Sequence, residues 1–136
     1  MVRLRSTANR FRVGFPIETV FNFGGGPGWR AASPGIQRIR LVLDQPRSIR
    51  RMRLQFNESD VARTQEFTVR MVQPPGRTLK EVVRQQWNFS PLSSEIELED
   101  YQVDLKAVSI LELAIDPDLG AGEAAATLAD WRAGGH

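Results

Sequence analysis

Apolar and polar side chains alternate along most of the chain from residue 36 onward. A period of two residues is typical of β-strands that bury one face and expose the other. The pattern predicts separate strands over residues 39–43, 52–56, 67–71, 96–105 and 110–115, with a turn at Asp44-Gln45-Pro46 between the first two. Pro74-Pro75-Gly76 is a further predicted break, because proline and glycine favour turns.

Two segments do not fit a single period. Residues 78–89 suit a helix or a strand, and we favour the strand because no strong helix cap precedes the segment and Pro91 follows it. Residues 123–131 are rich in alanine, which favours a helix by propensity, although the glycines around them and Thr127 allow a strand. Seven or eight strands at this spacing predict an all-β domain, an antiparallel β-sandwich of jelly-roll type.

The chain of 136 residues is long enough for one domain with its own core. We expect an N-terminal arm or edge strand over residues 1–14, the sandwich over residues 15–133 and a C-terminal tail over residues 134–136. No stretch approaches the ~18 apolar residues of a membrane span. The basic start at residues 1–6 is not followed by the apolar run of a signal peptide, which predicts a cytoplasmic protein.

Charge is distributed unevenly along the chain, although the net value is only +2. Residues 1–53 carry eleven arginines against two acids, a balance of +9, and residues 86–136 carry ten acids against two bases, a balance of −8. We expect basic strands of the first part to pair with acidic strands of the last part. Nucleic-acid binding is not favoured, because Phe56 and Phe67 fall on the apolar faces of their strands and leave no stacking platform.

The composition excludes several kinds of chemistry. There is no cysteine, and the one histidine is the terminal His136, so disulfides, zinc clusters, cysteine nucleophiles and histidine triads are not expected. Glu95, Glu97 and Glu99 share one strand face at a spacing of roughly 6.6–6.8 Å, which would suit an inverting glycosidase. We expect instead that this face is solvated and its charges are paired with arginines, and that the protein is not an enzyme.

Three segments resemble the galactose-binding-like sandwiches and the discoidin (coagulation factor type C) domains. Residues 28–41 (GWRAASPGIQRIRL) are similar to the family stretch in which a tryptophan follows a glycine loop and leads into "PG-x-Q-x-I-x-L". Residues 46–54 (PRSIRRMRL) are similar to the next strand, and residues 124–130 (AAATLAD) resemble the last strand of discoidin domains. The resemblance implies a non-catalytic binding module with its ligand at the loops of one end.

On this resemblance we expect a carbohydrate ligand, with Arg30, Arg84 and Trp87 as contact residues. A tryptophan can stack on the C–H face of a sugar, and polar neighbours can bind the hydroxyls. No cofactor is required, but the family implies a structural calcium ion, for which Asp130 stands where the family often has a glutamate, together with Asn22. The alternative is a protein–protein interaction or assembly domain that uses a sheet face.

Overall fold

The computed structural model describes residues 2–6, 19–23 and 29–135, and all of the regular structure within them is β. The strands are β1 (Val2–Ser6), β2 (Thr19–Phe23), β3 (Trp29–Pro34), β4 (Gln37–Asn57), β5 (Arg63–Val72), β6 (Lys80–Phe89), β7 (Ile96–Asp116), β8 (Ala125–Leu128) and β9 (Asp130–Gly134). The predicted all-β class is confirmed. No helix in the described part of the chain is long and apolar enough to cross a membrane.

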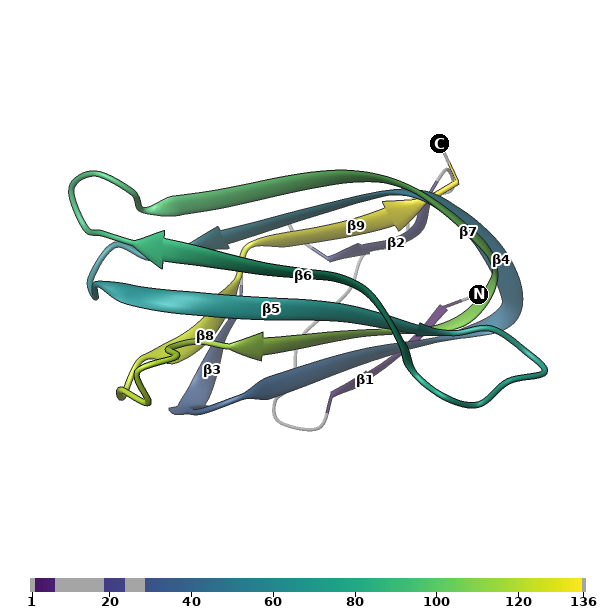
Figure 1. Ribbon diagram of the computed structural model, residues 1–136, viewed down its shortest axis with the longest axis horizontal. Coiled ribbons are helices and arrows are strands. Elements are labelled where there is room, and N and C mark those ends of the chain that lie inside the picture. Colours follow the sequence, from purple (N-terminus) through teal and green to yellow (C-terminus); the bar gives the residue numbers. More distant parts are fainter. Residues whose placement is uncertain (1, 7–18, 24–28, 136) are drawn as a thin grey trace.

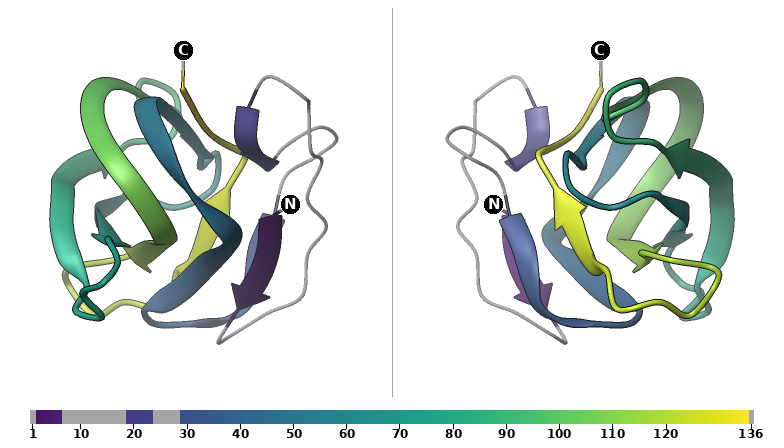
Figure 2. Two further views of the ribbon diagram at one scale, coloured as in Figure 1. Left: turned by 90° about the vertical axis from the view of Figure 1, so that its right-hand side faces the viewer. Right: turned by 90° about the vertical axis from the view of Figure 1, so that its left-hand side faces the viewer.

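Two long strands, β4 and β7, run through both layers of the sandwich (Figure 1). In one layer, the first part of β4 pairs with β1 and with the last part of β7. That part of β7 also pairs with β5, and β5 pairs with β6 at the edge. The second part of β4 pairs with the first part of β7 and with β9, which pairs with β2. This sheet therefore folds over on itself, and its two halves face each other across the core (Figure 2). β3 and β8 form a separate two-stranded sheet, which completes the antiparallel sandwich.

The prediction of a turn at Asp44-Gln45-Pro46 is wrong, because β4 continues through this segment and only bends there. Its pairing with β7 shifts register three times between Val42 and Arg51. On β7 the matching bend includes Ala107, whose φ is 54°. A bulge turns a strand without ending it, and a proline is tolerated where the pairing is interrupted. The two strands predicted on either side of the β7 bend are likewise one strand.

The two ambiguous segments both form strands. The predicted strand over residues 78–89 is confirmed by β6. Residues 123–131, where propensity favours a helix, form β8 and the beginning of β9. Ala126 and Leu128 on β8 are completely buried, and Trp131 on β9 is buried as well. Burial against the core has therefore overridden the helix propensity of the alanines.

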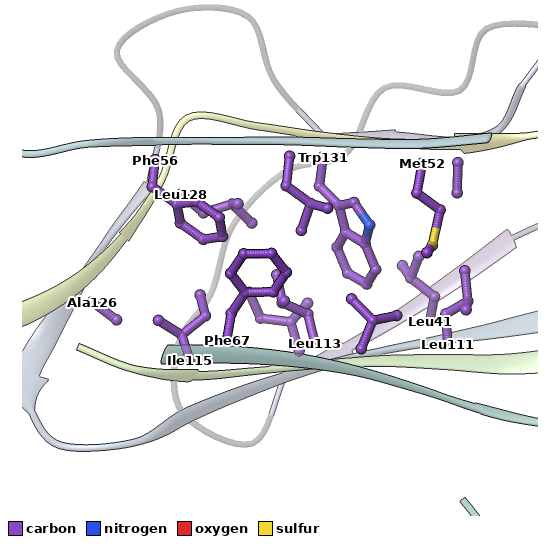
Figure 3. Close-up of a cluster of buried hydrophobic side chains, with 14 of the residues drawn as sticks. Leu41, Met52, Phe56, Phe67, Leu111, Leu113, Ile115, Ala126, Leu128 and Trp131 are labelled. Carbon is purple, nitrogen blue, oxygen red and sulfur yellow. The ribbon is translucent and has the colours of Figure 1, made fainter. Parts of the chain in front are cut away.

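The core lies between the two layers and is filled by the apolar faces that the alternation predicts (Figure 3). Phe56 on β4 stacks on Phe67 on β5 with ring centroids 5.1 Å apart, so these two residues join the layers. Trp131 projects from β9 into the same space, beside Leu113. The two phenylalanines are completely buried, as their strand patterns predict.

The predicted pairing of basic with acidic strands is confirmed along β4 and β7. Arg40 donates to Glu112 at 2.6 Å, and Arg51 donates two hydrogen bonds to Asp100 at 3.0 and 2.5 Å. Arg53 contributes a second ion pair to Asp100 at 3.6 Å. Opposite charges on neighbouring strands attract, so much of the charge that is segregated in the sequence is neutralised within the sheet.

Candidate functional site

Three connections meet at one end of the sandwich, which we call the loop end: the β4–β5 loop (58–62), the β6–β7 turn (90–95) and the β7–β8 loop (117–124). They lie together at the left of Figure 1. The backbone N–H of Glu58 donates to Glu95 O at 2.7 Å, and the N–H of Leu119 donates to Thr64 O at 2.8 Å. These bonds tie the connections to one another and to the strand ends.

An open hollow of about 330 Å³ lies at the loop end beside Trp87. Its lining consists of Gln86, Trp87 and Asn88 at the end of β6 and Ser94 in the β6–β7 turn. Trp87 is half-buried, and its indole nitrogen is buried without a hydrogen-bond partner. Gln86 and Asn88 lie on the outer face of β6 and Trp87 on the opposite face, where it packs against the core. At this end of the edge strand the hollow therefore offers two amides, a hydroxyl and the partly buried Trp87 to a polar ligand, and none of these groups is charged.

Two of the predicted contact residues, Arg84 and Trp87, lie on opposite faces of β6. Residues three apart in a strand project from opposite faces, and Arg84 lies on the outer face. Its guanidinium donates to Glu66 at 2.7 Å and to Glu81 at 2.8 Å. The hydrogen bond from Gln86, together with Arg84, lowers the pKa of Glu66. Arg84 is therefore held by carboxylates, and its link to the hollow runs through Glu66 and Gln86.

Beneath the loops lies a buried polar network centred on Arg63, whose side chain is completely buried. Its guanidinium donates to Glu58 at 2.9 Å, to the backbone oxygen of Pro117 at 2.7 Å and to Gln65 at 3.1 Å. It also donates to Thr127 at 3.3 Å and lies over the ring of Phe89, 4.6 Å from the centroid, as a cation–π contact. One side chain thus fixes the β4–β5 and β7–β8 loops against β5 and β8.

Arg30, the third predicted contact residue, lies beside this network. Its guanidinium is 3.7 Å from the Oε2 atom of Glu58, and half of its side chain is exposed. Burial opposes ionisation of Glu58, but the hydrogen bond from the N–H of Asp60 and the contacts with Arg63 and Arg30 outweigh it, so the pKa of Glu58 is lowered. The structure therefore places Arg30 in the network of the loop end, and it is not among the residues that line the hollow.

The prediction that Glu95, Glu97 and Glu99 share a solvent face is wrong, because Glu97 is completely buried. Its Oε1 accepts a hydrogen bond from Gln65 at 3.0 Å, and its Oε2 is buried without a partner. Burial, and after it the neighbouring carboxylate of Glu99, raise the pKa of Glu97 to about 9. Gln65 lies directly opposite Trp87 on the neighbouring strand, so Glu97 is two side chains from the hollow.

The expected calcium residues lie on one sheet, but the described groups do not fit the ion. Asn22 on β2 is paired with Arg132 on β9, two residues beyond Asp130, and the side chain of Asn22 is outside the described part of the structure. Arg132 donates to Asp130 Oδ2 at 3.0 Å, and the Oδ1 atom is buried without a hydrogen bond. Calcium takes six to eight oxygen ligands, and the described residues supply one carboxylate already bonded to a cation. They also hold no group of three metal-ligating side chains.

Sequence reasoning named Trp87 as a contact residue, which stays a prediction, and it missed the polar network at this end of the sandwich. A signal was present in β5, where Arg63 and Gln65 occupy the same alternating positions as Phe67 and Val69. Polar residues that continue an apolar stripe are candidates for a buried network, because strand geometry places them on the core side.

Several solved structures are similar to this chain, although the sequence matches no protein-family model and no curated protein. A family 32 carbohydrate-binding module from Clostridium perfringens, in complex with GalNAc-β-1,3-galactose, aligns with a TM-score of 0.60 and 14% identity, over 98% of this chain and 95% of that chain. The family 32 module of C. perfringens NanJ, in complex with galactose, aligns with a TM-score of 0.53 and 10% identity, over 97% and 93%. Truncated AlyQ, with CBM32 and alginate lyase domains, aligns with a TM-score of 0.57 and 16% identity, over 98% of this chain and 32% of that one.

At identities of 10–16%, the structural similarity shows that the fold is shared. The chain has the galactose-binding-like β-sandwich of these modules, as its sequence predicts.

Proposed function

We propose that this domain is a non-catalytic carbohydrate-binding module that holds a neutral saccharide in the hollow at Trp87. The observation that carries the proposal is the lining of the hollow, which combines the partly buried Trp87 with the amides of Gln86 and Asn88 and the hydroxyl of Ser94. Sugar rings present an apolar C–H face and a rim of hydroxyls, and this lining complements both. Modules of the same fold have been solved with galactose and with GalNAc-β-1,3-galactose, which supports the ligand class.

The charges around the hollow favour a neutral sugar over an acidic one. Gln86 donates to the carboxylate of Glu66 at 2.9 Å, and Glu95 directly follows Ser94 in the turn. No arginine or lysine lines the hollow. Arg84 is already paired with Glu66, so the hollow has no cation of its own to bind a carboxylate or sulfate on the ligand.

The Arg63 network supports this function by holding the loops in place before the ligand arrives. Arg63 is bonded to residues of both neighbouring loops and is completely buried. A site whose loops are already ordered loses less conformational entropy on binding.

Isothermal titration with a panel of neutral saccharides that includes galactose, N-acetylgalactosamine and lactose tests the proposal. Trp87→Ala removes the stacking surface and is expected to weaken binding by tenfold or more. Asn88→Ala removes one amide and its exposed hydrogen bond from Thr64, which costs the fold little, and is expected to weaken binding severalfold. Gln102→Ala is the matched control, since Gln102 is exposed on β7 away from the hollow. Unchanged affinity in both Trp87→Ala and Asn88→Ala would overturn the assignment of the hollow.

A second candidate function, an assembly domain that uses a sheet face, is favoured by two apolar side chains on β7. Ile96 and Leu98 are 55% and 52% exposed on its outer face, which is unusual for residues in a sheet. This function predicts a flat response to every sugar and a mass that rises with protein concentration in light scattering. Leu98→Lys would then restore the monomer mass.

A further inference from the structure

Apart from Arg38, the arginines from residue 30 onward fall into two groups according to their described charge partners. Those on the sheet faces and in the buried network have a carboxylate within 4 Å; these residues are Arg30, Arg40, Arg51, Arg53, Arg63, Arg70, Arg84 and Arg132. Arg47, Arg50 and Arg77 are exposed and have no ion pair with a described acidic side chain, and the same is true of Lys80 and Lys106. The unpaired cations are therefore a distinct set.

These five cations gather at the end of the sandwich opposite the loop end, which we call the bend end (right in Figure 1). Arg47 and Arg50 lie where β4 bends, and Lys106 lies where β7 bends beside it, two residues before the partner of Arg47. Arg77 lies in the β5–β6 loop and Lys80 begins β6.

The β5–β6 loop contacts the bend of β7, so the cations on these two segments belong to one surface. The side-chain amide of Gln73 in the β5–β6 loop donates to the backbone oxygen of Lys106 at 2.6 Å. Asp104 is the acidic residue on the neighbouring part of β7, and it forms no ion pair with the five cations. Asp44 in the bend of β4 is a second acidic residue of this end, so the five cations outnumber the two acids, although the whole chain is only +2.

We propose that the bend end is a second, electrostatic binding surface for an acidic polysaccharide, separate from the hollow at Trp87. Arginine forks bind carboxylate and sulfate groups in a bidentate manner, and a chain of such groups releases counterions when it binds several cations. The choice of a polysaccharide rests on the proposed function. A glycan with neutral and acidic parts would be held at both ends of the domain, and the two contacts would reinforce each other.

The shape and chemistry of the bend end favour a flexible glycan over nucleic acid or a membrane. None of the aromatic side chains with described burial is exposed, so single-stranded nucleic acid finds no stacking platform. Duplex DNA is straight on this scale, with a persistence length of about 500 Å, and meets a rounded end along one line. The exposed large apolar side chains of the described residues all lie elsewhere, at Ile36, Val61, Leu92, Ile96, Leu98 and Leu119, so no apolar anchor for lipid accompanies the cations.

Titration of the domain with heparin and with polygalacturonate over a range of sodium chloride concentrations tests the proposal. Five contacts at about 0.7 counterions each predict a slope of log K against log salt of about −3.5. Arg47→Gln combined with Arg77→Gln should lower the slope to about −2 and weaken binding about tenfold at low salt. Arg84→Gln combined with Arg132→Gln is the matched control, because it removes the same charge from arginines that are already ion-paired and lie away from the bend of β4. The control should bind within twofold of the wild type.

Three results would overturn the proposal. The first is equal loss of affinity in the bend-end and control variants, which would mean that net charge alone matters. The second is a 20-base-pair DNA duplex that binds as tightly as either polysaccharide. The third is the absence of salt-dependent binding to both polysaccharides. Trp87→Ala should keep its affinity for heparin, and the bend-end variant should keep its affinity for neutral sugars, so a failure of this proposal is distinguishable from a failure of the proposed function.

Discussion

Glu97→Gln should make the domain more stable at neutral pH, although it removes a buried hydrogen-bonding acid. The carboxyl of Glu97 is completely buried, and its pKa is raised from the ordinary 4.5 to about 9, first by burial and then by Glu99. At pH 7 the folded protein therefore holds a neutral acid there. Glutamine has the same shape, and its side-chain oxygen can keep the bond that Gln65 donates.

The magnitude follows from the difference between the two pKa values. The folded state keeps its proton while the unfolded state loses it, so the free energy of unfolding falls as the pH rises from about 4.5 to about 9. The loss is 1.36 kcal/mol per pH unit, which amounts to about 3 kcal/mol between pH 4.5 and pH 7. The variant lacks this titration. It should equal the wild type near pH 4.5 and exceed it by up to about 3 kcal/mol at pH 7.

Urea unfolding of both proteins, followed by tryptophan fluorescence from pH 4.5 to pH 9, measures the effect. Glu95→Gln is the matched control, because Glu95 is exposed and lies two residues before Glu97, just ahead of β7. The control should follow the wild type at every pH. Parallel curves for wild type and Glu97→Gln would refute the reasoning, since they would mean that Glu97 ionises in the folded state as it does in the unfolded one.

Three further predictions address the buried network, the core and the metal. Arg63→Met leaves the buried carboxylate of Glu58 without the cation that is hydrogen-bonded to it, and urea unfolding should show a loss of about 3–5 kcal/mol. Phe67→Ala opens a cavity in the core beside Phe56 and should cost about 3–5 kcal/mol in the same assay, whereas a loss under 1 kcal/mol would show that the layers are not packed there. The melting temperature should be equal in calcium and in chelator, because Arg132 already neutralises Asp130, and a rise of several degrees with calcium would show that the ion is bound.

The sequence by itself determined the class of the fold and the composition of its core. The alternation around Phe56 and Phe67 identified buried faces correctly, because a strand exposes its residues on two sides whatever its partners are. The opposite charges of the two ends of the chain predicted that basic strands would pair with acidic strands, as β4 does with β7. Trp87 was predicted from its polar neighbours, and it lines the hollow that the structure shows.

Only the tertiary structure decided which face of β7 is inside. Ile96 and Leu98 suggest one side, whereas Tyr101 and Leu105 suggest the other, and a single continuous strand can bury only one of the two sets. Packing against the core favours the set that contains Tyr101 and Leu105. Ile96 and Leu98 are therefore exposed, and Glu97, which shares the face of Tyr101, is buried. Alternation shows which residues share a face, but the neighbouring strands determine which face meets the core, and both the raised pKa and the buried network follow from that choice.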